Sequence, residues 1–263
     1  GTLTVLQKAL TITADNQGKI YGTTFTFAGT EFTTTGLIFT DSVSSVTLTS
    51  AGAPAAAPAG TYPIVPSAAV GTGLSNYAIT YVNGTMTVGT NVLTITADDQ
   101  TKTYGDVFTF NGTEFSVVGL QPGDSVASVT LTSAGAPSAA VVGTYPITPS
   151  AAVGTGLSNY VIVYSDGQMD VNQRSLTFNP ANQTKIYGSV FSAYTGAFTG
   201  LRAGDNITPI YDSLGAPATA IVGVYNITVT LDDPDGRLGN YIVTIDPAPT
   251  ATLTVTQRAL TVT

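Results

Sequence analysis

The chain has 263 residues, a net charge of −8 and no cysteine, histidine or tryptophan, which removes disulfides, histidine general bases and metal sites built on histidine or cysteine. With 8 basic against 16 acidic residues, nucleic acid and anionic lipid are poor partners. No apolar run reaches the roughly 18 residues that a membrane-spanning helix needs, so we expect no membrane insertion in this segment.

The sequence repeats itself. The pair Tyr21-Gly22 returns as Tyr104-Gly105 and again as Tyr187-Gly188. Residues 9–88 and 92–171 agree at about 56 of 80 aligned positions, and residues 175–255 form a third, more diverged copy. Self-similarity at a fixed period predicts a repeat protein, here with three bodies of about 80 residues.

One phrase occurs four times, at residues 1–13, 84–96, 167–179 and 251–263. We interpret it as the last strand of one repeat running into the first strand of the next. Residues 1–8 are then expected to be the last strand of a preceding repeat, and residues 259–263 the first strand of a following one. Because the phrase leaves little room for a flexible linker, we expect an elongated array. Because four copies of the phrase enclose three bodies, we expect this array to be cut from a longer one.

Within the first repeat, apolar residues alternate with threonine in several short runs, which is the pattern of half-buried strands. Taken in chain order, such runs include residues 10–13, 24–27, 46–49, 62–64, 77–81 and 86–88, with a turn at 15–18 and a loop at 51–60. Asn83-Gly84 lies between two of them and predicts a β-hairpin, as does Asp166-Gly167 in the second copy. The expected fold is all-β: three tandem small β-sandwich or β-roll repeats.

The expected core of the first repeat consists of its inward apolar residues. They are Leu10, Ile12, Tyr21, Phe25, Leu37, Val46, Leu48, Tyr62, Ile64, Tyr77, Ile79 and Met86.

A set of short motifs in the second copy resembles the MBG domain, named for "mostly beta, Gram-negative". The residues that carry the resemblance are Leu93 to Asp99, Lys102, Tyr104-Gly105-Asp106, Gly119-Leu120, Gly123-Asp124, Gly143-Thr144-Tyr145 and Asn159-Tyr160. The resemblance covers all three bodies and is weakest in the third. The first copy departs from the pattern with Thr23 after Tyr-Gly, and the third with Ser189.

The resemblance implies a secreted protein on the surface of a Gram-negative bacterium, since such domains are strung in tandem in large adhesins. We therefore expect a non-catalytic stalk or spacer that projects a binding region away from the cell. The alternative is a multivalent carbohydrate- or receptor-binding module. The expected partners are neighbouring repeats of the same chain, with host or surface glycans bound through other parts of the protein.

Clustered carboxylates are the one feature that could serve a metal ion, calcium. The candidates are Asp98, Asp99, Asp232, Asp233 and Asp235. The run from Asp232 to Asp235 occurs in one copy only and lacks a complete calcium loop, so a solvated acidic turn is the favoured interpretation. No cofactor and no catalytic residue is expected.

Three further patterns have a structural and a functional interpretation. The recurring Lys19, Lys102 and Lys185 could join Glu31 or Glu114 in an isopeptide crosslink, but an exposed lysine beside a surface acid is favoured. Asp41, Asp124 and Asp212, each followed by serine, fit an O-glycosylation triplet, but turn capping is favoured. The recurring tyrosines could form an aromatic platform for sugar, but core and rim packing with the hydroxyls at the surface is favoured. They are Tyr21, Tyr62, Tyr77 and Tyr81 in the first repeat. Any well-formed pocket is expected to differ between copies.

Overall fold

A computed structural model describes residues 1–246 and 251–260. Within these residues the regular structure is almost entirely β, and the helical segments are three 3-10 turns at Leu74–Asn76, Leu157–Asn159 and Leu238–Asn240. None of the described helices has the length and apolar character needed to cross a membrane. The prediction of an all-β fold in three repeats of about 80 residues is confirmed.

Each repeat contains seven strands. The first has β1 (Lys8–Ala14), β2 (Gln17–Ile20), β3 (Phe32–Thr35), β4 (Ser42–Thr49), β5 (Gly60–Thr72), β6 (Tyr77–Val82) and β7 (Gly84–Gly89). The second has β8 (Asn91–Ala97), β9 (Gln100–Thr103), β10 (Phe115–Val118), β11 (Ser125–Thr132), β12 (Gly143–Thr155), β13 (Tyr160–Ser165) and β14 (Gly167–Asn172). The third has β15 (Arg174–Pro180), β16 (Gln183–Ile186), β17 (Gly196–Thr199), β18 (Thr208–Asp212), β19 (Gly223–Asp232), β20 (Tyr241–Ile245) and β21 (Ala251–Thr256).

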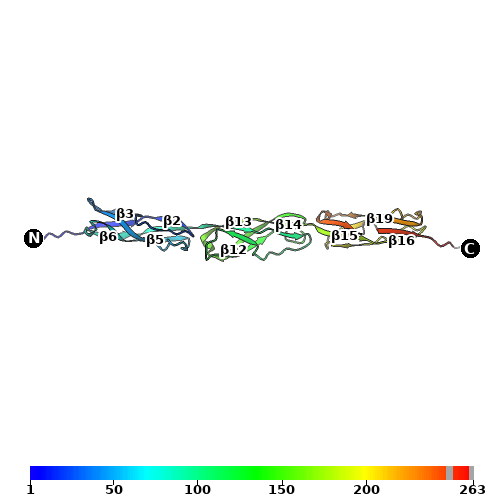
Figure 1. The fold of residues 1–263 in the computed structure, drawn as a ribbon, viewed down its shortest axis with the longest axis horizontal. Helices are drawn as coiled ribbons and strands as arrows, with labels where there is room; N and C mark the ends of the chain where they lie inside the picture. The colour runs from blue at the N-terminus through cyan, green and yellow to red at the C-terminus, as the bar shows by residue number, and fades with distance from the viewer. Residues whose placement is uncertain (247–250, 261–263) are drawn as a thin grey trace. The chain divides into compact units, whose positions relative to one another are not determined.

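The strands of a repeat form two sheets, one with three strands and one with four. In the first repeat the orders are β3-β1-β6 and β2-β7-β5-β4. The first strand pairs in parallel with β6, and the last strand, β7, pairs in parallel with β2. Figure 1 shows β3 and β6 near one end of this repeat, with β2 and β5 farther along. The other two repeats have the same orders at the equivalent strands.

The predicted hairpin at Asn83-Gly84 is wrong. β6 belongs to the three-stranded sheet and β7 to the four-stranded sheet, so the chain passes from one sheet to the other at this point. A type I′ hairpin needs a positive φ at both central residues, and Gly84 does not have one. Glycine is required for another reason: a Cβ on Gly84 would lie 2.5 Å from the carbonyl oxygen of Ala14, where the chain also changes sheets.

The predicted strand at Phe25 and Phe27 is also wrong, because residues 24–27 are not paired in a sheet. The Phe25 backbone N–H instead donates to the carbonyl oxygen of Ala53 in the loop, at 2.9 Å. The two rings pack edge to face with centroids 5.0 Å apart. Alternation in this segment therefore reflects aromatic packing on a loop.

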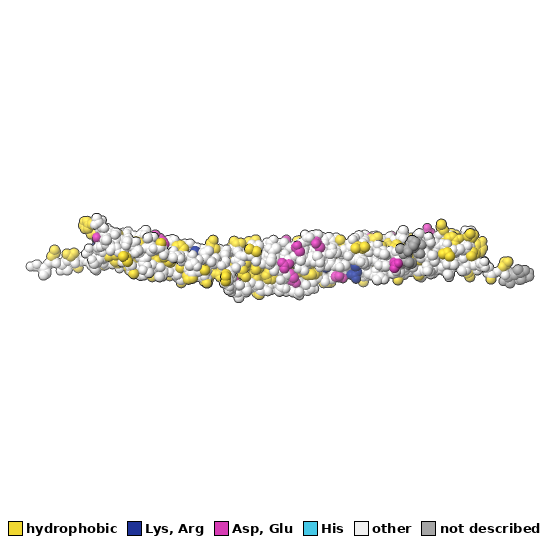
Figure 2. Space-filling model, viewed as in Figure 1, with side chains coloured by type: hydrophobic (Ala, Val, Ile, Leu, Met, Phe, Trp, Pro, Cys, Tyr) yellow, Lys and Arg dark blue, Asp and Glu magenta, His cyan; other side chains and the backbone are white. Residues whose placement is uncertain are grey.

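The core of each repeat lies between its sheets and is built from alternate residues of the central strands. In the first repeat, Leu10, Ile12, Ile64 and Met86 have no exposed surface, and burying one such side chain fully contributes about 1.5–3 kcal/mol. Other predicted core residues are half-buried, namely Phe25, Leu37, Tyr62 and Ile79. Outward positions carry threonine, and Figure 2 shows few charged side chains among the uncharged surface atoms.

Consecutive repeats are separated by a single residue, Thr90 between β7 and β8 and Gln173 between β14 and β15. Residues 1–7 and 257–260 belong to no strand. Of the strand predicted at 259–263, residues 261–263 lie outside the described residues.

The chain divides into two compact units by its internal contacts. Unit 1 contains Gly1–Ala97, Gly112–Thr130 and Pro149–Ser165, and unit 2 contains Asp98–Asn111, Leu131–Thr148 and Asp166–Thr263. The boundary runs through the second repeat. The junction between the first and second repeats therefore lies inside unit 1, and the junction between the second and third lies inside unit 2.

Candidate functional site

The Tyr-Gly pair of each repeat forms a turn directly after the second strand. The Tyr21 backbone N–H donates to the carbonyl oxygen of Gly89, the last residue of β7, at 2.8 Å. Tyr104 is held in the same way by Asn172, and Tyr187 by Thr256. These bonds place each tyrosine beside the point at which the chain leaves its repeat.

At the first junction, one carboxylate joins tyrosines of two repeats. The hydroxyl of Tyr21 donates to Asp124 Oδ2 at 2.8 Å, and the hydroxyl of Tyr160 donates to the same oxygen at 2.6 Å. The two rings meet edge to face with centroids 5.5 Å apart. Both tyrosines are buried. We call this group, a tyrosine of one repeat with an aspartate and a tyrosine of the next, the tyrosine–aspartate latch.

The second junction has the same latch. The hydroxyl of Tyr104 lies 3.0 Å from Asp205 Oδ2, and the hydroxyl of Tyr241 donates to that oxygen through a shorter bond. The rings again meet edge to face at 5.5 Å. Tyr104 has no exposed surface, and Asp205 is buried with it.

A second contact accompanies each latch. Asn159, next to Tyr160, accepts a hydrogen bond from the backbone N–H of Ala59 at 2.9 Å. Asn240, next to Tyr241, accepts one from Val142 at the same distance. Each Asn-Tyr pair of a repeat thus contacts two different loops of the repeat before it.

The second junction also carries two ion pairs. Arg202 Nη1 lies 3.1 Å from Asp205 Oδ1, and its guanidinium lies 5.7 Å from the centre of the Tyr104 ring. Arg174 Nη1 lies 3.1 Å from Asp106 Oδ1. Gln121 and Asn91 stand at the equivalent positions of the first junction, so neither ion pair has a counterpart there.

The latch raises the pKa of its tyrosines, because burial and a neighbouring carboxylate both disfavour the phenolate. Burial, followed by the hydrogen bond to Asp124, raises the pKa of Tyr160 to about 12. Burial and then Asp205 raise the pKa of Tyr241 to about 12. For Tyr21 the pKa is also raised, and the hydrogen bond to Asp124 is the larger cause.

The glycine of the Tyr-Gly pair is favoured by its backbone conformation, and it lies close to a side chain of the next repeat. Gly22 has a φ of +87°, and a Cβ built on it would lie 2.4 Å from the Gln121 side chain of the next repeat. Gly105 has a φ of +89°, and its Cβ would lie 3.1 Å from Arg174. Left-handed backbone favours glycine, whereas the flexible ends of Gln121 and Arg174 could move aside for a Cβ.

The prediction that the recurring lysines are exposed and lie beside surface acids is wrong. The Lys102 ammonium donates to the backbone oxygens of Asp106 at 2.8 Å and Ala136 at 3.3 Å, and also to that of Pro137. Lys102 is 8% exposed, and burial lowers its pKa. Lys185 donates to the equivalent oxygens of Ser189, Ala216 and Pro217. The lysine therefore fastens the loop after Tyr-Gly to the Gly-Ala-Pro loop.

The acid proposed for the isopeptide crosslink in the first repeat has a different role. The Glu31 carboxylate accepts backbone N–H groups from Ala28, Gly29 and Thr30 at 2.7 to 3.0 Å. Lys19 instead donates to the backbone oxygens of Thr23 and Pro54. Glu31 thus caps its own loop, and Lys19 holds other loops together.

The calcium candidates do not come together. Asp99 accepts the backbone N–H of Gln168 at 2.7 Å, a role that the neutral Asn16 and Asn182 fill in the other repeats. Asp233 accepts the backbone N–H groups of Arg237 and Leu238. Asp98 precedes β9, Asp232 ends β19, and Asp235 lies in the turn after it. No group of three acidic ligands is present in residues 1–246 and 251–260.

Shallow apolar grooves lie beside the phenylalanine pairs of the first two repeats. One is lined by Phe25, Phe27, Leu48 and Pro54, and the other by the equivalent Phe108, Phe110, Leu131 and Pro137. These two shallow grooves are lined by equivalent residues. In the third repeat the rings differ: Tyr194 stacks on Tyr211 with centroids 5.2 Å apart.

A family model described as MBG domain (YGX type) matches residues 10–87, 93–170 and 176–254. The chain belongs to the MBG domain family. The three matches cover the three bodies that the fold and the latch define, and the Tyr-Gly turn that builds each junction is part of every matched segment. No curated protein matches the MBG chain.

Sequence reasoning found the latch residues but not their relationship. Gly123-Asp124, Gly204-Asp205 and the three Asn-Tyr pairs recur at fixed spacing. The sequence favours a turn cap for Asp124, gives Asp205 no role of its own, and places the tyrosine hydroxyls at the surface. Only the positions of two repeats together reveal that the tyrosine of one meets the aspartate of the next.

Proposed function

We propose that these repeats are a non-catalytic spacer in a secreted, cell-surface adhesin of a Gram-negative bacterium. The observation that carries the proposal is the latch, which joins the same residue types in the same geometry at both junctions. A binding or catalytic site has no need to recur between every pair of domains. A spacer does, because each junction must hold the angle between its neighbours.

The short linkers support the same function. A single residue separates the last strand of one repeat from the first strand of the next, which leaves no flexible coil between them. The polar threonine faces suit an exposed β protein, because threonine favours strands and adds no large apolar patch to the surface.

Small-angle X-ray scattering of the 263-residue chain tests the spacer. We expect a radius of gyration well above the ~18 Å of a single compact domain of this length. A value near 18 Å would contradict the spacer function.

The alternative, a multivalent glycan- or receptor-binding module, is favoured by one observation, the equivalent phenylalanine grooves of the first two repeats. A glycan array probed with the intact chain and with the double variant Phe25→Ala, Phe108→Ala separates the two functions. Binding that disappears in the variant would favour the alternative, and no binding by either chain would favour the spacer.

A further inference from the structure

The strand β13 of the second repeat has an open edge. It stands at the end of the order β10-β8-β13, so it has a neighbouring strand on one side alone in the part of the chain that the structure describes. Its six residues include no proline and no charged residue, and it pairs with β8 over six consecutive residue pairs without a register shift. Natural edge strands are usually short, charged, bulged or covered, because an open edge can pair with another chain.

The other edge strands of this repeat carry such protection. β9 and β10 have four residues each. β11 borders β12, in which Ala151 has a φ of +49°, and the equivalent pair of the first repeat, β4 and β5, contains two register shifts. β13 is therefore the edge of the second repeat that is best suited to accept a further strand.

The side chains of β13 make this edge apolar. Val161 and Val163 are 54% and 46% exposed. Tyr160 and Ile162, which alternate with them, are buried and half-buried, so the two valines lie on the outward face of the sheet. Val161 is aligned with Val92 of β8. It therefore has an apolar neighbour on one side and solvent on the other.

This apolar edge is specific to the second repeat. Ala78 and Thr80 stand at the two valine positions in β6, although the first two repeats are otherwise closely similar in sequence. In β20 the second of these positions is again a threonine, Thr244. The fold that the repeats share does not require the two valines, which points to a role for them outside the repeat.

We propose that β13 pairs edge to edge with β13 of a second copy of this chain, antiparallel and about a two-fold axis at Ile162. The two three-stranded sheets then join into one sheet of six strands. The inference goes beyond the proposed spacer function and does not rest on it, because it concerns how one chain meets another.

The alternation of β13 fixes the register of this pair. Residues directly opposite each other share a face of the sheet, and a shift of one residue would bring Val161 to the core face. Two registers meet this condition with equal overlap, centred on Ile162 or on Val163. The first sets Val161 against Val163 of the partner subunit twice over. The second sets Val161 against Ser165 of the partner subunit, so the first matches more apolar surface.

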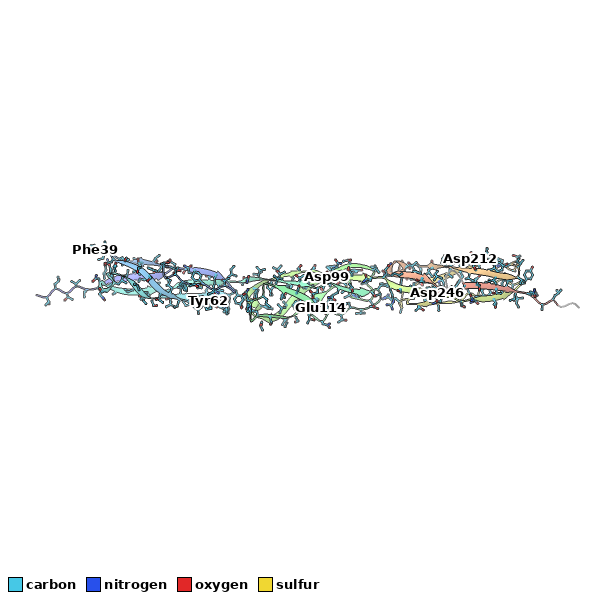
Figure 3. All side chains as sticks on the ribbon, viewed as in Figure 1. Phe39, Tyr62, Asp99, Glu114, Asp212 and Asp246 are labelled. Carbon is cyan, nitrogen blue, oxygen red and sulfur yellow. The ribbon has the colours of Figure 1, made fainter. Side chains whose placement is uncertain are left out.

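The carboxylates around the sheet favour the antiparallel orientation. Glu114, which Figure 3 shows on the middle of the three repeats, precedes β10. Asp98 and Asp166 directly follow β8 and β13 along the chain. Because β8 and β13 are parallel and β10 is antiparallel to β8, all three residues adjoin the same end of the sheet. Antiparallel pairing keeps this end away from the same end of the partner, whereas parallel pairing would bring like charges together.

Disulfide formation tests the register, because the chain has no cysteine of its own. Val161→Cys and Val163→Cys chains are oxidised separately and as an equal mixture. In the mixture the two cysteines lie directly opposite each other, with Cβ atoms about 4.5–5.5 Å apart, whereas in either variant alone they are diagonal neighbours about 7–8 Å apart, too far for a disulfide. We expect the mixture to form crosslinked dimer at least about tenfold faster.

The matched control for the crosslink uses the equivalent positions of β6. A mixture of Ala78→Cys and Thr80→Cys chains should crosslink no faster than either variant alone, because β6 lacks the paired valines.

Sedimentation equilibrium tests which surface associates. The average mass of the original chain is expected to rise with concentration above 26.8 kDa. The edge variant, Val161→Ala with Val163→Thr, gives β13 the side chains of β6 and should weaken association by about tenfold, because two cross-strand valine pairs are lost. The matched face variant, Val92→Ala with Val118→Thr, makes the corresponding change on β8 and β10. It should leave association unchanged, because these strands lie behind the edge.

The inference is overturned if the mass stays at 26.8 kDa at every concentration, or if the edge variant associates as strongly as the original chain. It is also overturned if the face variant loses association, or if either cysteine variant alone crosslinks as fast as the mixture. The spacer function fails separately, on a compact radius of gyration, so the two failures are distinguishable.

Discussion

The hydroxyl of Tyr21 reaches across a repeat boundary to the carboxylate of Asp124, 103 residues later, at 2.8 Å. The same oxygen accepts the hydroxyl of Tyr160 from its own repeat. The aspartate is therefore shared between intra-repeat and inter-repeat structure, and removing its charge weakens both.

Asp124→Asn is expected to lower the free energy of unfolding by about 1–2 kcal/mol, because hydrogen bonds to a charged acceptor are stronger than those to a neutral amide. The measurement is chemical unfolding followed by tyrosine fluorescence. The matched control is Asp41→Asn, where the carboxylate accepts the hydroxyl of Tyr77 alone; its cost should be about half as large. Equal costs for the two variants would contradict a role of Asp124 at the junction.

Gly22→Ala is expected to cost about 1–2 kcal/mol or more, since an alanine must adopt a left-handed φ of +87°. The control is Gly239→Ala, where φ is not in the left-handed range and nothing lies within 4 Å of the added Cβ. The second variant should unfold like the parent chain. If Gln121→Ala restored all of the stability lost in Gly22→Ala, the steric contact rather than the backbone would be the cause.

Alkaline pH is expected to destabilise the chain between about pH 10 and 12. The pKa values of Tyr160 and Tyr241 are about 12 in the folded chain, against an ordinary 10. The unfolded chain therefore loses these protons first, so stability is complete below pH 10 and is lost as pH rises towards 12. Thermal unfolding across this range measures the loss. Tyr160→Phe with Tyr241→Phe should flatten the dependence, and an unchanged slope would contradict it.

The two arginines of the second junction should differ in importance. The Asp205 side chain is 2% exposed beside Arg202, whereas Arg174 and Asp106 are 35% and 58% exposed. Arg202→Gln leaves a buried carboxylate with one partner fewer and should cost about 1–3 kcal/mol. Arg174→Gln should cost less than about 1 kcal/mol, and that loss should vanish in high salt. Thermal unfolding at low and high salt separates the two variants. Equal losses, or a loss in Arg174→Gln that persists in high salt, would contradict the prediction.

Patterns within a few residues could be predicted from sequence. The alternation at Leu10 and Ile12 reflects one buried face of β1, and that of Val46 and Leu48 one face of β4. The same alternation was misleading at Phe25 and Phe27, because a loop whose two half-buried rings pack on each other has the same period as a strand.

Relationships over long distances could not be predicted. Asn83-Gly84 has hairpin chemistry, but the sheet that receives β7 is decided by β5 and β2, which lie far away in sequence. Lys102 looked exposed because a lone lysine usually is; its burial depends on backbone oxygens 34 and 35 residues later. The latch is built from residues of two consecutive repeats, so the sequence pattern of one repeat alone cannot reveal it.

The parallel pairing of the first strand of a repeat, β1, with β6 has a consequence under tension. When a repeat is pulled by its two ends, β1 must slide along β6, to which it is aligned over six residue pairs from Lys8 to Thr13. Its hydrogen bonds then lie across the direction of force and share the load, whereas a terminal hairpin would unzip one bond at a time. Under such tension the repeat is expected to yield by shear, and to resist until many bonds break together.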